Sequence, residues 1–177
     1  ASRALLAAGK SVRVVVRDES KGDIWKERGA EVAIASLTDT AALKNALSGA
    51  QGAYLISPPH YASNDLFTQA DIIANTIAEA ATKAQLPKIV ALSSIGAEKA
   101  AGTGWIAMNR MLEHSLCQTG LPTTFLRAAY FMQNWEPMVK AAMMHGKLPS
   151  FLSPADRKLP MISTDDIGYL AAEILSE

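Results

Sequence analysis

The sequence predicts an α/β fold in which a mainly parallel sheet is covered by helices on both faces. Short β-branched runs alternate with amphipathic segments along the whole chain, which is typical of repeated strand–helix units. The strands are continuously apolar rather than alternating, as expected where helices cover both faces of a sheet. A length of 177 residues suits one core, so we expect a single domain over residues 1–177.

The first third of the chain contains three predicted strands and two predicted helices. The β-branched run 11–17 predicts the first strand, and residues 30–35 predict the second. The helix between them, 18–29, begins with capping residues and ends at a glycine. A second helix, 37–50, begins with Thr and Asp and carries apolar residues at helical spacing. The third strand, 52–57, is ended by two prolines.

The middle of the chain contains the longest helix and the most apolar strand. Residues 64–85 predict the helix, because apolar side chains recur along one side of it. Residues 87–94 predict the strand. A helix over 102–120, closed by a glycine, leads to a fifth strand over 122–130. These alternating elements extend the parallel sheet.

The last part of the chain is less regular. Residues 134–146 predict a helix with a proline near its first turn. The segment 146–158 predicts a loop that lies over a pocket. A short strand over 159–163 and a capped helix over 164–177 complete the chain.

Composition and charge exclude several classes of function. Lys plus Arg and Asp plus Glu both number 17, so no global basic field attracts nucleic acid or an anionic membrane. Cys117 is the single cysteine, and we expect a buried structural thiol there. No apolar run is long enough to span a bilayer, and no signal peptide is visible. We therefore expect a cytoplasmic protein that binds neither nucleic acid nor membrane.

Metal and hydrolase chemistry find no support in the sequence. The three histidines lack the spacing of metal ligands, and CxxC, GxSxG and P-loop motifs do not occur. We predict no metal site. The methionines of the predicted helix 134–146 are interpreted as core filler; they are Met138, Met143 and Met144.

The first nine residues have the pattern of the end of a helix, closed by Gly9. In a dinucleotide-binding sheet, the first strand enters the first helix through a Gly-rich turn, where backbone N–H groups meet the pyrophosphate. Neither GxGxxG nor GxxGxxG occurs in this sequence. We therefore interpret residues 1–9 as the end of that first helix, with the first strand and the turn absent from the sequence.

Arg17 ends the strand 11–17, at the position that selects the cofactor in such sheets. An acidic residue there binds the ribose 2′-OH of NAD, whereas an arginine accommodates the 2′-phosphate of NADP. The guanidinium is planar and always charged, which suits a phosphate. Two alternatives stay open: a solvated arginine at a strand end, and NAD binding through the adjacent Asp18.

Five segments in order resemble the NmrA-like branch of the atypical short-chain dehydrogenase/reductases: ALLAAGKSVRVVVRD, LISPPH, IVALSSIGA, LPTTFLRAAYFMQN and KLPMISTDDIGYLAAEIL. The resemblance covers essentially the whole chain. It implies a Rossmann-type, doubly wound parallel sheet that binds NADP(H) by preference, with NAD(H) as the alternative. Members of this family include NADPH-dependent quinone and azo-dye reductases, and a fungal regulator that binds the nucleotide without known turnover.

The resemblance also implies segments outside this sequence: a central strand with its Gly-rich turn before residue 1, and a substrate-covering region after residue 177. That strand would lie between 12–16 and 52–57. We therefore expect these two strands not to pair directly. Unpaired edges inside a sheet are costly, so we expect a partner, a further segment or a rearranged sheet to fill the gap.

The implied cofactor lies at the carboxyl ends of the strands, as in open α/β sheets generally. The resemblance assigns Arg17 to the 2′-phosphate, Ser36 and Leu37 to the adenine, Ser57, Pro58 and Pro59 to the ribose and pyrophosphate, Ser93 and Ser94 to the nicotinamide, and Tyr130 and Phe131 to the nicotinamide or substrate pocket. Family members often carry an aspartate in place of Ser36. The alternatives are turn chemistry for Ser57, Ser93 and Ser94 and core packing for the two aromatic residues.

The proton donor is not assigned. Ordinary short-chain dehydrogenases use YxxxK, in which the lysine lowers the pKa of the tyrosine. The matching helix here offers Trp105 and Asn109, neither of which is an acid near neutral pH. Other candidates follow only from their location near strand ends; they are Tyr54, His60, Tyr61 and Tyr130.

The lack of a Tyr–Lys pair bears on the substrate. A ketone accepting hydride forms a strongly basic alkoxide, whereas a quinone forms a phenolate-like anion that water can protonate. We therefore expect an NAD(P)H-dependent oxidoreductase that reduces a quinone-like acceptor. The alternative is a non-catalytic NADP-sensing regulator that acts through a protein partner. A homodimer stays open.

Overall fold

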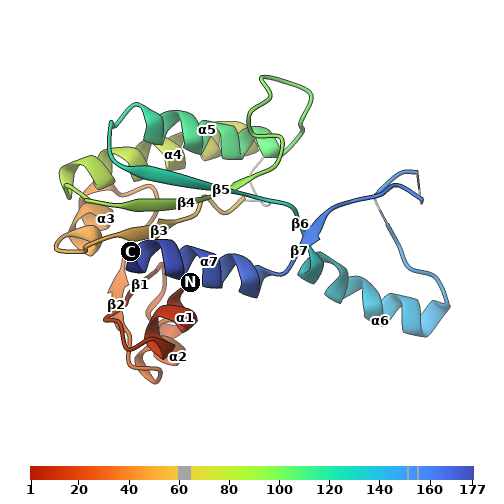
Figure 1. Cartoon of the computed structure of the whole chain (residues 1–177), viewed down its shortest axis with the longest axis horizontal. Coiled ribbons are helices and arrows are strands. Elements are labelled where there is room, and N and C mark those ends of the chain that lie inside the picture. Colours follow the sequence, from red (N-terminus) through yellow and green to blue (C-terminus); the bar gives the residue numbers. More distant parts are fainter. Residues whose placement is uncertain (60–64, 151, 155) are drawn as a thin grey trace.

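The computed structural model describes residues 1–59, 65–150, 152–154 and 156–177 (Figure 1). Its elements in chain order are α1 (Ser2–Ala7), β1 (Arg13–Val16), the 3₁₀ helix η1 (Glu19–Lys21), α2 (Asp23–Lys26), β2 (Glu31–Ile34), α3 (Thr40–Leu47), β3 (Ala53–Leu55), α4 (Leu66–Lys83), β4 (Ile89–Ser94), α5 (Ile106–Cys117), β5 (Thr123–Ala128), β6 (Tyr130–Phe131), the 3₁₀ helix η2 (Met132–Trp135), α6 (Glu136–His145), β7 (Met161–Ile162) and α7 (Thr164–Ser176).

All strand pairs are parallel, as the alternation of strands and helices predicts. β4 is central to a three-stranded sheet in the order β3–β4–β5, and β1 pairs with β2 in a separate two-stranded sheet. β6 and β7 form a third, short pair. Among the described residues β1 does not pair with β3, which confirms the expectation that these two strands do not pair directly.

Helices cover both faces of the three-stranded sheet (Figure 1). α4 and α5 pack together on one face, with α3 beside α4, while α7 packs on β3, β4 and β5 from the opposite side. The side chains of β4 alternate between these layers: Ala91 belongs to the apolar cluster of α3, α4 and α5, and Val90 belongs to the cluster of α7. Both residues are fully buried. The predicted Rossmann-type arrangement is therefore confirmed.

The β1–β2 pair is attached to the rest of the molecule through side chains rather than through a strand ladder. The Arg13 guanidinium donates to the backbone oxygens of Ala46 (2.9 Å) and Ser48 (3.0 Å) at the end of α3. α1 packs against α7, where Arg3 forms an ion pair with Asp165. These contacts fix the first sheet beside α7, where Figure 1 shows it.

The predicted strand 122–130 is divided in the structure. β5 ends at Ala128, and the chain then forms β6, which pairs with β7 rather than with the main sheet. The backbone N–H of Ile95 donates to the oxygen of Ala128 at 3.0 Å, so the pairing of β4 and β5 ends at this point. The break turns Tyr130 and Phe131 away from the main sheet.

Two predictions about sulfur-containing residues are wrong. Cys117 is exposed rather than buried, because it lies in the last turn of α5. α6 contains no buried residue: Met138 is half-buried, and Met143 and Met144 are 83% and 67% exposed. The physical reason is that α6 extends away from the body of the molecule (Figure 1), so its apolar side chains have no core to enter.

Candidate active site

The predicted cofactor residues follow the carboxyl ends of parallel strands. In the first sheet, Ala35 donates its N–H to the oxygen of Val16 at 3.0 Å. Arg17 and Ser36, which come next along their strands, therefore share one edge of that sheet. Arg17 is exposed. A guanidinium at a solvent-facing strand end is accessible to an anionic ligand.

The neighbours of Arg17 have roles of their own. Asp18 is the cap residue of η1, and its carboxylate lies 3.4 Å from the Lys21 ammonium. At the end of β2, the Ser36 hydroxyl and the Thr38 hydroxyl are 2.8 Å apart, and Ser36 Oγ accepts the N–H of Thr38. Ser36 thus forms a local turn. Leu37 packs partly buried against the main core.

Ser57, Pro58 and Pro59 follow β3 at the edge of the three-stranded sheet. Ser57 is half-buried, and the two prolines are exposed. His60 and Tyr61, named as candidates by location, lie outside the described residues.

Ser93 and Ser94 end β4 but point to opposite faces of the sheet. Ser93 is 2% exposed and donates its hydroxyl to Oε1 of Glu113 at 2.5 Å. Ser94 is half-buried and its hydroxyl lies 3.2 Å from the backbone oxygen of Ile95. Because the Ser93 hydroxyl is already committed to a carboxylate, Ser94 is the better placed of the two for a ligand.

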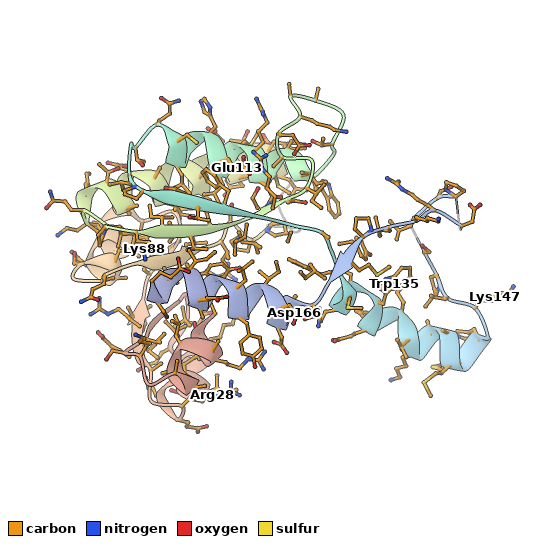
Figure 2. All side chains as sticks on the ribbon, in the orientation of Figure 1. Arg28, Lys88, Glu113, Trp135, Lys147 and Asp166 are labelled. Carbon is orange, nitrogen blue, oxygen red and sulfur yellow. The ribbon has the colours of Figure 1, made fainter. Side chains whose placement is uncertain are left out.

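Glu113 is the residue that sequence reasoning missed. Its side chain lies between α5 and β5 (Figure 2) and is 8% exposed. Arg127 on β5 donates Nε to Oε1 at 2.9 Å and Nη2 to Oε2 at 2.6 Å. The available sequence signal was a charged residue inside each of two predicted elements, an arginine in the strand 122–130 and a glutamate in the helix 102–120.

The same cluster extends to the loop after β4. Arg110, one turn before Glu113 on α5, donates to the backbone oxygens of Ala97 (3.3 Å) and Glu98 (3.1 Å). The Glu98 carboxylate accepts the N–H of Gly96 at 3.0 Å and lies 4.0 Å from Arg127. α5 therefore holds the ends of β4 and β5 and the loop 95–98 together.

The charge of Glu113 makes a pH-dependent contribution to stability. The Arg127 hydrogen bonds lower the pKa of Glu113 below its ordinary value of 4.5, although burial opposes the shift. A group with a lowered pKa in the folded state stabilises the fold fully above its unfolded pKa, and this contribution is lost as the pH falls through the folded pKa.

We therefore expect Glu113→Gln to lower the free energy of unfolding by about 1–3 kcal/mol at pH 7. The difference from wild type should shrink below about pH 4.5. Urea unfolding at pH 7, 5, 4 and 3 measures it. Glu173→Gln, on the exposed face of α7, is the control and should change little at any pH. A Glu113→Gln difference that stays constant from pH 7 to 3 would contradict the assignment.

Tyr130 and Phe131 have different surroundings. Phe131 packs with Ile162 against the apolar cluster of α7, so it serves the core. Tyr130 faces Trp135, with ring centroids 6.2 Å apart, and lines a hollow of about 70 Å³ together with Asn134, Met138, Pro149 and Ser150. Of the two predicted pocket residues, Tyr130 alone borders this hollow.

No Tyr–Lys pair lies along α5. Trp105 is the cap residue of the helix and is 58% exposed, and Asn109 is half-buried. Burial raises the pKa of Tyr54 in β3 to about 12, which makes its hydroxyl a weak acid near neutral pH. The proton donor therefore stays unassigned.

Two further kinds of site, a metal centre and a membrane span, concern the described ranges of the chain. No group of three or more His, Cys, Asp or Glu side chains there is arranged to hold a metal ion. None of the helices in that part of the chain combines the length and the apolar character needed to cross a membrane.

The comparisons with known proteins agree on family and fold. A family model described as NmrA-like matches residues 1–177. Quinone oxidoreductase 2 of Escherichia coli strain K12 is 29% identical over 164 residues, which make up 92% of this chain and 54% of that protein. The chain thus spans about half the length of this curated relative.

Two solved structures are similar over most of the chain. The triphenylmethane reductase of Citrobacter sp. complexed with NADP(H) has a TM-score of 0.81 at 21% identity, covering 99% of this chain and 61% of that one. The NADPH-dependent quinone oxidoreductase of Escherichia coli complexed with NADPH has a TM-score of 0.69 at 25% identity, covering 82% of this chain and 50% of that one. These values establish a shared fold.

Proposed function

The chain belongs to the NmrA-like family, and from this membership we propose that it is the NAD(P)-binding domain, over residues 1–177, of an NADPH-dependent oxidoreductase. We propose a quinone-like molecule as the acceptor. The observation that carries the proposal is the similarity to a quinone oxidoreductase over 92% of the chain, together with Arg17 at the carboxyl end of the first strand. When bound, NADPH supplies the hydride, and the acceptor receives it.

The chain's own residues have distinct tasks in this proposal. Arg17 binds the 2′-phosphate and sets the preference for NADP(H) over NAD(H). Ser36, Leu37, Ser57, Pro58 and Pro59 border the adenosine and pyrophosphate. Ser93 and Ser94 border the nicotinamide, and Tyr130 borders the acceptor. Within this set, the hydrogen bonding of Ser93 favours Ser94 as the direct contact.

A quinone suits this site because its reduced form is a phenolate-like anion. The phenol that forms when this anion is protonated has an acidity close to that of a tyrosine, so water can supply the proton. A site whose helix carries Trp105 and Asn109 in place of a Tyr–Lys pair needs no protein acid for such an acceptor. The same features also suit a regulator that binds NADP without turnover and acts through a protein partner.

One assay on the protein that contains this chain separates the two functions. NADPH absorbance is followed with and without a soluble benzoquinone, and NADP binding is measured in parallel by calorimetry. We expect NADPH consumption that depends on both the quinone and the protein. Measurable NADP binding without consumption would overturn the reductase and favour the regulator.

A further inference from the structure

We propose that Glu113 is a positioning residue, which holds the nicotinamide edge of the proposed cofactor site in place without touching the cofactor. This inference rests on the proposed function. It begins from a geometric fact: Ser93 on β4 and Arg127 on β5 are register partners, and both donate to the same carboxylate. One side chain from α5 therefore fixes two neighbouring strand ends.

The residues that follow Ser93 and Arg127 along their strands belong to the proposed cofactor site. Ser94 directly follows Ser93, and its register partner is Ala128. Tyr130 comes two residues later, after the break that ends β5. The two residues that donate to Glu113 thus stand one residue before Ser94 and three residues before Tyr130. A change at Glu113 therefore acts on the strand ends that lead directly to both positions.

The loop after β4 is held from the same side. Arg127 reaches Glu98, whose carboxylate accepts the N–H of Gly96. Arg110, three residues before Glu113, holds the backbone of the same loop. Gly96 has a φ of +97°, a conformation that other residues adopt at a cost. The cluster therefore supports a special backbone geometry directly beyond Ser94.

A contribution to stability does not by itself explain why Glu113 is paired with Arg127 and Ser93. The Arg127 side chain is 42% exposed, so water screens its attraction to Glu113, while burial of the carboxylate costs desolvation. The bidentate geometry of the pair does provide fixed orientation. Orientation is what hydride transfer requires, since a displacement of about 1 Å costs on the order of 100-fold in rate.

The test uses the emission of bound NADPH, which reports the surroundings of the nicotinamide and does not need turnover. At saturating NADPH and well below the unfolding temperature, we expect Glu113→Gln to lose at least about half of the wild-type emission enhancement, and any quinone-dependent kcat to fall at least about tenfold. NADPH affinity should change less than about threefold, because Arg17 and the adenosine contacts are unaffected. Glu113→Asp, which keeps the charge, should recover part of both signals.

Ser115→Ala is the matched control. Ser115 lies two residues further along α5, is also 8% exposed, and donates to Asn75 on α4 rather than to the strand ends. We expect it to keep the wild-type emission and kcat. Equal losses in both variants, or a Glu113→Gln protein with unchanged emission, would overturn the inference. If the wild type binds NADPH without turnover, the reductase proposal fails while the emission comparison still decides the role of Glu113. If the wild type binds no NADPH, both proposals fail.

Discussion

Replacing Arg17 with alanine is expected to remove most of the preference for NADPH over NADH. Hydrogen bonds to a charged group contribute about 1.5–3 kcal/mol. The dissociation constant for NADH divided by that for NADPH should therefore fall by about 10- to 100-fold. The loss should come from weaker NADPH binding, because NADH has no 2′-phosphate to lose. Titration of both nucleotides against wild type and variant, at one fixed salt concentration, measures the ratio.

The control for Arg17→Ala is another exposed arginine of the same small sheet region. Arg28 follows α2, and its guanidinium lies 5.5 Å from the centre of the Trp25 ring. Arg28→Ala removes the same charge from the protein without changing the end of β1. It therefore distinguishes the loss of a direct contact with the 2′-phosphate from the loss of one positive charge. An unchanged NADPH-to-NADH ratio in Arg17→Ala, or an equal loss in Arg28→Ala, would contradict the assignment of the 2′-phosphate to Arg17.

Asp18 is the residue of the other cofactor alternative, in which its carboxylate binds the ribose of NAD. In the structure it is the cap residue of η1 and lies beside Lys21. Its carboxylate makes no capping hydrogen bond, and its side chain and that of Lys21 are each 61% exposed. Asp18 and Arg17 are therefore both accessible to a cofactor, and the Arg17→Ala titration decides between them.

Local patterns predicted the elements because the spacing of apolar residues along the chain indicates which side of each element is buried. The apolar run of β4 and the helical spacing of α4 are both local signals, and both elements appear near the predicted residues. The separation of β1 from β3 was expected from the family resemblance and not from a local pattern. The division of 122–130 at Ala129 was not predicted, because the pairing of β6 with β7 depends on contacts about thirty residues apart.

The parts of the site that were missed depend on long-range contacts between side chains. Glu113 and Arg127 are fourteen residues apart, and their pairing follows from the packing of α5 on β5. From the sequence, Ser93 and Ser94 are equivalent; the structure separates them by face, because successive residues of a strand point in opposite directions. The exposure of Met143 likewise depends on where α6 lies, which residue type cannot predict.

Truncating Leu112 to alanine is expected to lower the free energy of unfolding by about 3–5 kcal/mol. Leu112 on α5 is fully buried in the cluster that joins α4, α5 and the central sheet, where it belongs with Ile73 and Ile77. Removing a large side chain there costs its burial and also leaves a cavity that rigid neighbours fill only in part. Urea unfolding followed by circular dichroism measures the change.

Leu170 offers the matched substitution for this test. It lies on α7 and is 42% exposed, so Leu170→Ala removes the same atoms from a site where water can replace them. We expect a loss below about 1 kcal/mol, because little apolar area leaves the interior and alanine favours helices. A cost for Leu112→Ala no larger than that for Leu170→Ala would mean that α4 and α5 do not form the main core. The support of Glu113, one residue further along α5, would then lose its basis as well.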